Sequence, residues 1–405
     1  MHKGTPVLCC SPFTFLTFLQ SLQLSPKTAG CCSTRAGAVH PYRLVTGILS
    51  RLLKYYPSRL ASVFFVPCRS LIEDSSFDLY THTPCIKISP PVSGASPALY
   101  QITTPKGTIL TPHIIHATNG WISHLLPGMR GKIVPVRGVV TAQRPWRGLG
   151  DIPDSPCHPV ADSEKPESWT GARSFVFYPG DLMSTYDYLI QQPAAPETID
   201  SECTAYPAPE GELMLGGGFD LTAIGNVDDR SWDPETEKYL SSRLGDYFEG
   251  PQAVTSGKRV KQVWSGVESL SVDEKPWVGR IPEKISGRRV SSSRTGAIGD
   301  QEPASRGTET SADRLGSGAS AKAPATGLAA PGEWMAAGYT GEGMVHAWMS
   351  GKAFAYMVLG FDVVDDEEKG EGDLVEWFPD VFRVTEERWK NTGIDDRTED
   401  FISLD

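Results

Sequence analysis

The stretch AAGYTGEGMVHAW (residues 336–348) leads from small apolar residues through a glycine-rich turn into a helical pattern. Its glycines, Gly338, Gly341 and Gly343, permit positive φ angles and let a ligand approach the backbone closely. A turn that opens a helix presents free N–H groups, which favour an anion or a polarised carbonyl group. A tight turn between two packed elements explains the same pattern equally well, because short glycine motifs are weakly specific.

The residues after the turn are apolar on almost every side of the predicted helix. Residues 344–359 include Val345, Trp348, Phe354 and Met357. A helix that is apolar all round is typical of a buried position. We therefore predict a buried helix directly after the turn.

The composition is that of a globular protein with a small-molecule ligand. The 405 residues are 40% hydrophobic and 21% charged, which suffices for two domains or one large one. A net charge of -11 and a pI near 5.3 argue against nucleic acid or an anionic membrane as the main partner, since both bind basic surfaces. The eight cysteines have no metal-binding spacing. We expect free thiols, no metal site and a reducing, cytoplasmic location.

The N-terminal region contains an apolar-leaning run over residues 7–24. This run resembles a signal-peptide core, but Pro12 and Gln23 interrupt it and it is too polar for a transmembrane span. A secretory location, with residues 1–30 as a signal peptide, is therefore the alternative. No other stretch of the sequence is long and apolar enough to cross a bilayer. We expect residues 1–35 to form an atypical, disordered leader.

The hydrophobic pattern predicts helices around a mainly β middle region. Apolar residues three and four apart predict a helix over residues 42–56, ended by Pro57, and the charge pattern of residues 235–248 predicts an exposed helix. Runs rich in β-branched residues and bounded by Pro and Gly predict strands. These strands cover residues 100–103, 107–110, 113–116, 132–142, 174–178 and 212–215, with strand and loop over 263–279. Low complexity predicts a disordered insertion at residues 286–331.

Several sequence blocks together carry a resemblance to a known family. They are IIHATNGW (114–121), GKIVPVRGVVTAQRP (131–145), VWSGVESLSVDEKPWVG (263–279) and GEWMAAGYTGEGMVHAW (332–348). In order and spacing they resemble the FAD-dependent oxidoreductases of the D-amino acid oxidase and sarcosine oxidase superfamily. Residues 36–53 resemble the preceding segment of fungal members. The resemblance implies an α/β fold, in which a Rossmann-like FAD-binding domain is interrupted by a substrate domain with a mixed or antiparallel sheet.

The implied domains are discontinuous in sequence. Residues 36–130 and 332–389 would form the remainder of the FAD-binding domain, and residues 131–285 the substrate domain. A C-terminal tail follows at residues 390–405. A strand that ends in ATNG also puts Thr118 and its neighbours at the carboxyl edge of a sheet, where open α/β sheets bind their ligands.

The resemblance assigns the contacts with FAD to three short segments. The assigned residues are Thr118, Asn119, Gly120, Arg137, Gly138, Gly338, Tyr339, Thr340, Gly341, Glu342, Gly343 and Met344. Backbone N–H groups of residues 340–344 would stabilise negative charge on the reduced flavin. A carboxylate there would oppose reduction, so we expect Glu342 to point away or to be paired. No cysteine follows residue 203, so the FAD would be bound non-covalently.

The resemblance also implies the chemistry and the substrate class. In the family an amine transfers hydride to the flavin and leaves as an imine, so the expected ligand is a small amine or amino acid. Arg137 is the candidate catalytic residue, as an anchor for a substrate carboxylate, with a surface arginine at a strand edge as the alternative. Tyr186 and Tyr188 are candidates for the substrate side, with ordinary strand packing as the alternative.

The family's phosphate-binding fingerprint is missing from this sequence. Members begin with a strand and GxGxxG, whereas the similar string GSGASA (316–321) lies in the predicted insertion with no strand before it. The pyrophosphate normally rests on that glycine unit, so we expect this chain alone to bind FAD weakly or not at all. Two functions remain open. One is an FAD-dependent oxidoreductase, and the other is an inactive truncated remnant that acts at most as a binding module.

Overall fold

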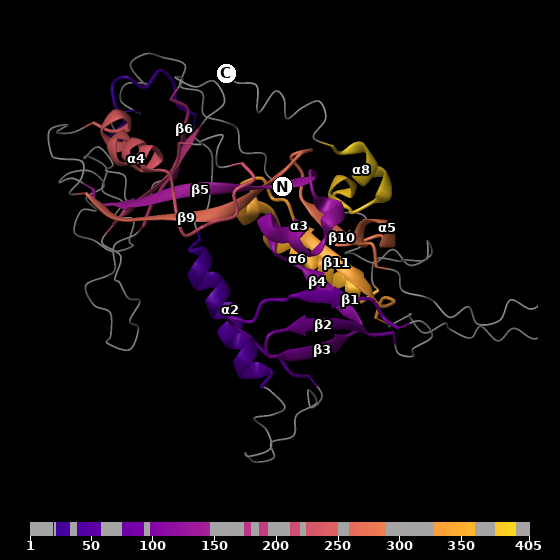
Figure 1. The fold of residues 1–405 in the computed structure, drawn as a ribbon. Helices are drawn as coiled ribbons and strands as arrows, with labels where there is room; N and C mark the ends of the chain where they lie inside the picture. The colour runs from indigo at the N-terminus through magenta and orange to yellow at the C-terminus, as the bar shows by residue number, and fades with distance from the viewer. Residues whose placement is uncertain are drawn as a thin grey trace, which may run out of the picture. The chain divides into compact units, whose positions relative to one another are not determined.

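The structure is a computed structural model in which two compact units are recognised. It describes residues 19, 22–32, 39–57, 75–92, 98–145, 174–179, 186–192, 211–218, 224–249, 259–288, 328–360 and 377–393. Unit 1 spans Met1–Leu79 and Pro135–Glu268, and unit 2 spans Tyr80–Val134 and Ser269–Asp405. Helices and three separate sheets confirm the predicted α/β class (Figure 1). Residues 269–285, expected in the substrate domain, fall in unit 2, and the domain boundaries stay a prediction.

Unit 1 is built around a five-stranded sheet with the order β6-β7-β8-β5-β9. Its strands are β5 (Ile133–Gln143), β6 (Ser174–Phe177), β7 (Asp187–Gln191), β8 (Leu213–Gly217) and β9 (Val260–Ser271). The β6–β7, β7–β8 and β8–β5 pairs are antiparallel. The registers place Tyr188 and Val140 on either side of Gly216. Strands β5, β6, β8 and β9 lie where the sequence predicts β structure, whereas β7 is not among the predicted strands.

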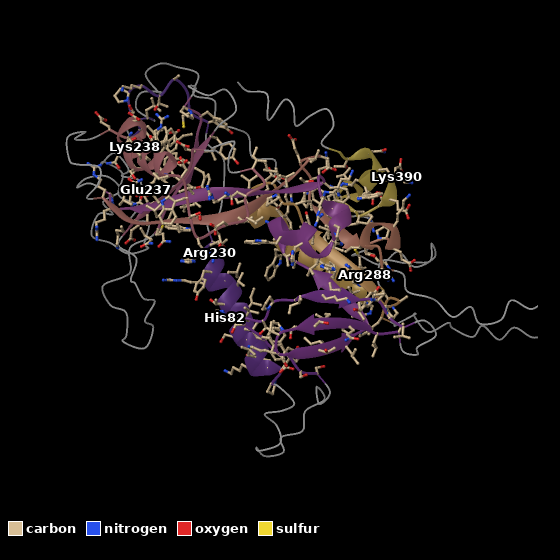
Figure 2. The ribbon with its side chains drawn as sticks, viewed as in Figure 1. His82, Arg230, Glu237, Lys238, Arg288 and Lys390 are labelled. Carbon is tan, nitrogen blue, oxygen red and sulfur yellow. The ribbon has the colours of Figure 1, made fainter. Side chains whose placement is uncertain are left out.

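Helix α4 (Pro234–Tyr247) packs one side against this sheet. The Asp233 carboxylate caps it by accepting from the backbone N–H three residues on, at 2.8 Å. Leu240 and Leu244 are buried in the core of unit 1, whereas Lys238 on the other side is exposed (Figure 2). The expectation of a fully exposed helix is therefore wrong on one side, because the two leucines, four residues apart, share a face.

Part of the predicted disordered leader belongs to the core of unit 1. Leu22 and Leu24 are buried, and Leu24 forms a β-bridge with Phe248 at the end of α4. The backbone N–H of Ser25 donates to the carbonyl of Tyr247 at 2.8 Å. The expected disorder is thus wrong for these residues, because their apolar side chains pack against that end of the helix.

The expected disordered insertion at residues 286–331 is wrong at its two ends. At one end Ser286 ends a short helix and Arg288 bonds to Glu333. At the other end the Ala329 N–H donates to the Val358 carbonyl. Residues 1–18, 20–21, 33–35, 289–327 and 394–405 lie outside the described residues, so the remaining expectations for leader, insertion and tail stay predictions.

The predicted N-terminal helix is present as α2 (Pro41–Tyr55), with Pro57 shortly after its end. None of its residues is buried among the described residues. The cysteines in the described part of the chain are free thiols. No described helix combines the length and the apolar character that crossing a membrane requires.

Unit 2 contains two three-stranded sheets. The order β10-β11-β4 joins β10 (Trp277–Arg280), β11 (Gly332–Ala337) and β4 (His113–His116). In it β11 and β4 are parallel, whereas β10 and β11 are antiparallel. The antiparallel sheet β1-β2-β3 consists of β1 (Lys87–Ser89), β2 (Tyr100–Thr104) and β3 (Gly107–Thr111). The three strands predicted between residues 100 and 116 are confirmed.

Short helices surround a small core in unit 2. They are α3 (Ile122–Leu125), α5 (Glu283–Ser286) and α8 (Glu386–Asn391). The core includes Ile122, Met129, Trp277 and Met335, each fully or almost fully removed from solvent. Burial of such side chains stabilises this unit by about 1.5–3 kcal/mol each.

Helix α6 (Gly343–Val358) follows the glycine turn as predicted, but it is only half buried. Phe354 and Met357 are buried, and Phe354 packs edge-on against Trp334 with ring centroids 5.6 Å apart. Val345 and Trp348 are 69% and 66% exposed. The prediction of a buried helix is therefore wrong, because α6 contacts β10 and β11 through one side and nothing among the described residues covers the other.

A buried ionic network joins the two parallel strands of unit 2. Glu333 on β11 accepts from His116 on β4 at 2.9 Å. Arg288 holds the same carboxylate with two hydrogen bonds of 2.7 and 2.6 Å. Burial alone would raise the pKa of Glu333, but the bonds from Arg288 and His116 outweigh it and lower the pKa. The network satisfies a carboxylate that would otherwise be costly inside the unit.

Candidate functional site

The edge of unit 2 where β4 and β11 end brings together two of the predicted segments. Because the strands are parallel, both carboxyl ends lie at the same edge of the sheet. Asn119 opens the short helix η2 (Asn119–Trp121) after β4, and Gly338 directly follows β11. The Asn119 Oδ1 atom accepts from the Gly338 backbone N–H at 3.1 Å and from the Ser269 hydroxyl at 2.6 Å. One side chain therefore links the ATNG segment, the glycine turn and the end of β9.

The turn has the left-handed backbone that its glycines predict. Gly338 and Gly341 have φ angles of 78° and 80°. A side chain on Gly338 would also meet the Ile133 and Trp277 side chains at 3.1 and 3.2 Å. Gly338 and Gly341 are thus required by the conformation, and Gly338 also by the packing beneath it. The expectation of a positive φ is wrong at Gly343, because this residue is already the first of α6.

Thr340 also has a positive φ, of 51°, although its side chain is β-branched. Such a conformation is a genuine outlier that costs roughly 1–3 kcal/mol and persists only where the surroundings impose it. The Thr340 N–H donates to the Ser269 carbonyl at 3.0 Å, and the Thr340 hydroxyl accepts from the Ser271 N–H at 3.0 Å. Strain that is held in this way is frequent at ligand sites, which makes the turn a candidate site.

Only part of the predicted row of N–H groups is available to a ligand. The N–H groups of Thr340 and Glu342 already donate to backbone carbonyls. Those of Gly341, Gly343 and Met344 have no acceptor in the part of the chain that the structure describes. They precede or begin a helix of 16 residues that has no side-chain cap. The positive end of the helix dipole adds to their attraction for an electron-rich group.

Glu342 is paired, as expected. Its exposed carboxylate lies 3.0 Å from the His346 Nε2 atom, one helical turn further on. The His346 ring in turn packs edge-on against Phe382, with centroids 5.2 Å apart. The pair directs the Glu342 carboxylate toward His346 on α6. No described side chain of the turn therefore accepts a hydrogen bond from the N–H groups of Gly341, Gly343 and Met344.

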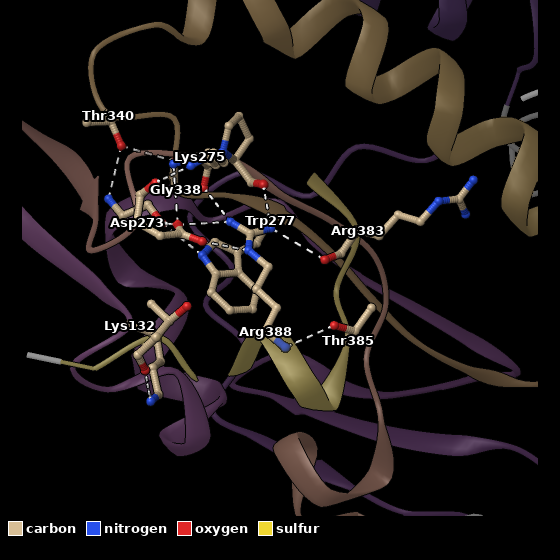
Figure 3. Close-up of polar contacts among 12 residues, drawn as sticks. Lys132, Asp273, Lys275, Trp277, Gly338, Thr340, Arg383, Thr385 and Arg388 are labelled. Atoms are coloured by element: carbon tan, nitrogen blue, oxygen red, sulfur yellow. Dashed lines mark hydrogen bonds and ion pairs between the residues drawn. The ribbon is translucent and has the colours of Figure 1, made fainter. Parts of the chain in front are cut away.

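A second network fixes the serine that holds Thr340 (Figure 3). The Ser271 hydroxyl donates to Asp273 at 2.7 Å and accepts from the Trp277 indole N–H at 2.9 Å. Arg388 grips Asp273 with bonds of 2.8 and 3.0 Å, and its guanidinium lies 3.8 Å from the centre of the Trp277 ring. Burial would raise the pKa of Asp273, but the bonds from Arg388 and Ser271 lower it. The turn therefore rests on a rigid, charged support.

Sequence reasoning missed the residues of this support. Ser269, Ser271 and Asp273 lie in the block VWSGVESLSVDEKPWVG, but the pattern assigned no role to them. Arg388 lies 115 residues away from Asp273 in sequence, and nothing near it pointed to the site. Serines and arginines are too common for their position alone to indicate such contacts.

The other predicted site residues, Arg137 and Gly138, lie on β5 in unit 1. Arg137 donates to the Ser231 hydroxyl at 3.3 Å, ahead of α4, and its buried Nε has no acceptor among the described residues. Gly138 lies beside β9, where a Cβ would stand 3.4 Å from the Glu268 carboxylate. Their contacts are made within unit 1, and their role at a flavin stays a prediction.

Comparison with known proteins identifies the family. A family model described as FAD dependent oxidoreductase matches residues 17–357. The chain belongs to this family. The resemblance to the D-amino acid oxidase and sarcosine oxidase superfamily is confirmed, and FAD is the cofactor of the family. Curated protein sequences gave no match.

Solved structures similar to this chain are remote. Glycine oxidase from Geobacillus kaustophilus is 16% identical, with a TM-score of 0.40 over 76% of this chain and 53% of that chain. L-proline dehydrogenase from P. horikoshii is 15% identical, with a TM-score of 0.38 over 69% and 50%. Iminodiacetate oxidase from Chelativorans sp. BNC1 is 13% identical, with a TM-score of 0.36 over 72% and 52%. The chain spans about half the length of each of these proteins.

Proposed function

We propose that this FAD-dependent oxidoreductase oxidises a C–N bond of a small amine or amino acid. The observation that supports the proposal is the turn at the edge of the parallel strands, where three N–H groups have no acceptor among the described residues. Bound FAD would supply the two-electron oxidant. The chain's own residues would supply binding, orientation and charge.

The residues of the turn fit an electron-rich ring. Gly341 and Gly343 carry no side chain, so a flat group can approach their N–H groups closely. The N-terminus of α6 favours negative charge in front of it. Asn119 and Thr340 keep the turn in place through the bonds described above, so that little reorganisation is needed when a ligand binds. Thr118, Gly120 and Tyr339 flank these groups and stay candidate contacts.

Arg137 stays the candidate anchor for a substrate carboxylate. A guanidinium binds a carboxylate through two parallel hydrogen bonds, and the unpaired Nε of Arg137 is one donor that such a bond would use. The bond to Ser231 is 3.3 Å long, and an incoming carboxylate would compete with it.

The alternative is an inactive binding module. In family members a GxGxxG unit receives the pyrophosphate of FAD, and the alternative applies if this chain holds FAD too weakly for turnover. On this alternative the glycine turn would keep its fold without supporting turnover.

Titration with FAD, followed by amine-dependent dye reduction, tests the proposal. Because this chain is expected to bind FAD weakly, quenching of flavin fluorescence should need a high FAD concentration, and at that concentration added amines or amino acids should reduce dichlorophenolindophenol. Asn119→Ala should weaken FAD binding about tenfold, because it removes the acceptor that fixes Gly338. Asn226→Ala, which removes a comparable asparagine acceptor in unit 1, is the matched control. FAD binding without turnover of any amine or amino acid would favour the binding module.

A further inference from the structure

The five-stranded sheet of unit 1 has two chemically different faces. Asp187 and Leu189 on β7 face α4 and are fully buried. Side chains alternate along a strand, so Tyr188 lies on the opposite face. The register places Gly216 beside Tyr188 and Val140 beside Gly216 on that face. The face away from α4 is thus lined by an aromatic residue and a glycine.

Two polar groups of unit 1 have no partner in the described part of the chain. The Glu268 carboxylate on β9 lies beside Gly138 and makes no hydrogen bond or ion pair there. The Tyr188 ring lies over Gly216, with its hydroxyl 2.5 Å from where a Cβ would stand, and it too makes no hydrogen bond. Burial raises the pKa of Glu268, and burial together with the Glu268 charge raises the pKa of Tyr188. The Glu268 charge acts on Tyr188, so the two groups lie within electrostatic reach of each other.

Open space and a second aromatic residue lie next to Glu268 on the same strand. Gly266 has nothing within 4 Å of where its Cβ would stand. Trp264 is 38% exposed. Residues 264, 266 and 268 alternate along β9, so they share one face of the strand. A ligand lying over Gly266 would therefore have a carboxylate on one side and an indole on the other.

This combination suits a cation. A half-buried carboxylate without a partner gains most from a cationic ligand, whereas an anion would be repelled. Aromatic faces add cation–π attraction for an ammonium group. Arg137, next to Gly138 in sequence, does not neutralise Glu268. It donates to the Ser231 hydroxyl, ahead of α4, instead.

We propose that Glu268, flanked by Tyr188 and Trp264, is a recognition site for the ammonium group of an organic amine. The inference rests on the proposed function in one respect, since it names the charged group by which a substrate would be held. It assigns recognition to Glu268 and no proton transfer.

Ligand-observed NMR titration of the full chain at pH 7.5 tests this site. The probes are n-butylammonium, the neutral n-butanol and the anionic butyrate. We expect n-butylammonium to bind at least tenfold more tightly than the other two, and Glu268→Gln to weaken its binding about tenfold by removing the charge. Glu235→Gln, which neutralises an exposed carboxylate paired with Lys238 on α4, is the matched control and should leave binding unchanged.

Absence of n-butylammonium binding, or equal binding by Glu268→Gln, would overturn the site. Should the Gln variant fail to fold, the wild-type pH profile decides. Because the pKa of Glu268 is raised above 4.5, affinity should already fall at a pH where an ordinary glutamate is still ionised. A flat profile would also overturn the site. The titration needs no FAD, so amine binding without FAD-dependent turnover would refute the proposed function alone, and turnover that Glu268→Gln leaves unchanged would refute the site alone.

Discussion

Two glycine-rich stretches, one in each unit, use their glycines in different ways. The glycines of unit 1, residues 216–218, make room for neighbouring side chains. A Cβ on Gly217 would stand 2.7 Å from the Asp187 Cα, and one on Gly218 would stand 2.9 Å from the Tyr239 ring. The space that these glycines leave is filled by the protein itself.

In the turn of unit 2 Gly338 is packed closely, against Ile133 and Trp277. Gly338 and Gly341 have left-handed φ angles, and a Cβ on Gly343 would meet nothing closer than 3.8 Å. Next to them lie N–H groups that no described residue accepts.

Both clusters contain positive φ angles, since Gly217 and Gly218 have φ angles of 137° and 58°. The difference is that neighbouring residues fill the space beside the glycines of unit 1, whereas the space beside Gly343 in unit 2 has room for a Cβ. A glycine cluster identifies a ligand site only when the space beside it is not already occupied.

The largest effect is expected for Gly217→Ala in unit 1. The new Cβ would collide with Asp187, at a φ of 137°, so the free energy of unfolding should fall by about 3 kcal/mol. Urea unfolding measures it. Gly225→Ala is the control, because Gly225 also has a positive φ but nothing lies within 4 Å, and it should cost about 1 kcal/mol. Equal losses would show that conformation and not packing explains the glycines of unit 1.

Asp187→Asn tests whether the side chain that fills this space is held by its charge. Asp187 accepts from the Gly218 N–H at 2.9 Å and from the hydroxyls of Tyr239 and Tyr247. An amide offers one acceptor fewer to three donors, so we expect a loss of about 2 kcal/mol in urea unfolding. Asp246→Asn, at a half-exposed surface ion pair, should change stability by less than about 1 kcal/mol. If Asp187→Asn leaves the free energy of unfolding unchanged, the charge of Asp187 does not hold the side chain that fills the space beside the glycines of unit 1.

Asn119→Ala tests whether the conformation of the glycine turn in unit 2 depends on the hydrogen bond from Gly338 to Asn119. Loss of Oδ1 removes the acceptor of Gly338 and Ser269, and alanine tolerates the φ of 45° less well, so stability should fall by about 1.5 kcal/mol. Amide hydrogen exchange at Gly338 should accelerate. Asn119→Asp keeps the acceptor and should protect that amide. Unchanged exchange in the alanine variant would mean that the turn keeps its conformation without the Asn119 side chain.

The smallest effect on the free energy of unfolding is expected when Asp273, which pairs with Arg388, loses its charge. The folded-state pKa of Asp273 lies below 3.8, so its contribution to stability is complete above pH 3.8 and is lost as the pH falls through the folded pKa. Asp273→Asn should cost about 1 kcal/mol at pH 6, and its disadvantage should shrink at pH 3. Thermal unfolding at the two pH values measures the difference. A penalty that does not depend on pH would contradict the charge-based support.

The sequence by itself determined the family and most of the longer strands and helices, because those depend on several motifs in a fixed order and on local hydrophobic periodicity. It did not predict β1, β7 or the short helices α3, α5 and α8. The helix after the turn, the strand ending in ATNG and the positive φ angles of Gly338 and Gly341 were predictable in this way. Which helix face is covered was not predictable, as α6 shows, because burial depends on what the rest of the chain places beside it.

Only the tertiary structure decided how the two glycine clusters differ. Asp187 and Gly217 meet across neighbouring strands, and Asp273 meets Arg388 across 115 residues of sequence. It also decided which N–H groups of the turn stay free, since Ser269 reaches Thr340 from the end of another strand. Such contacts arise from strand register and packing between distant segments, and a local sequence pattern therefore does not predict them.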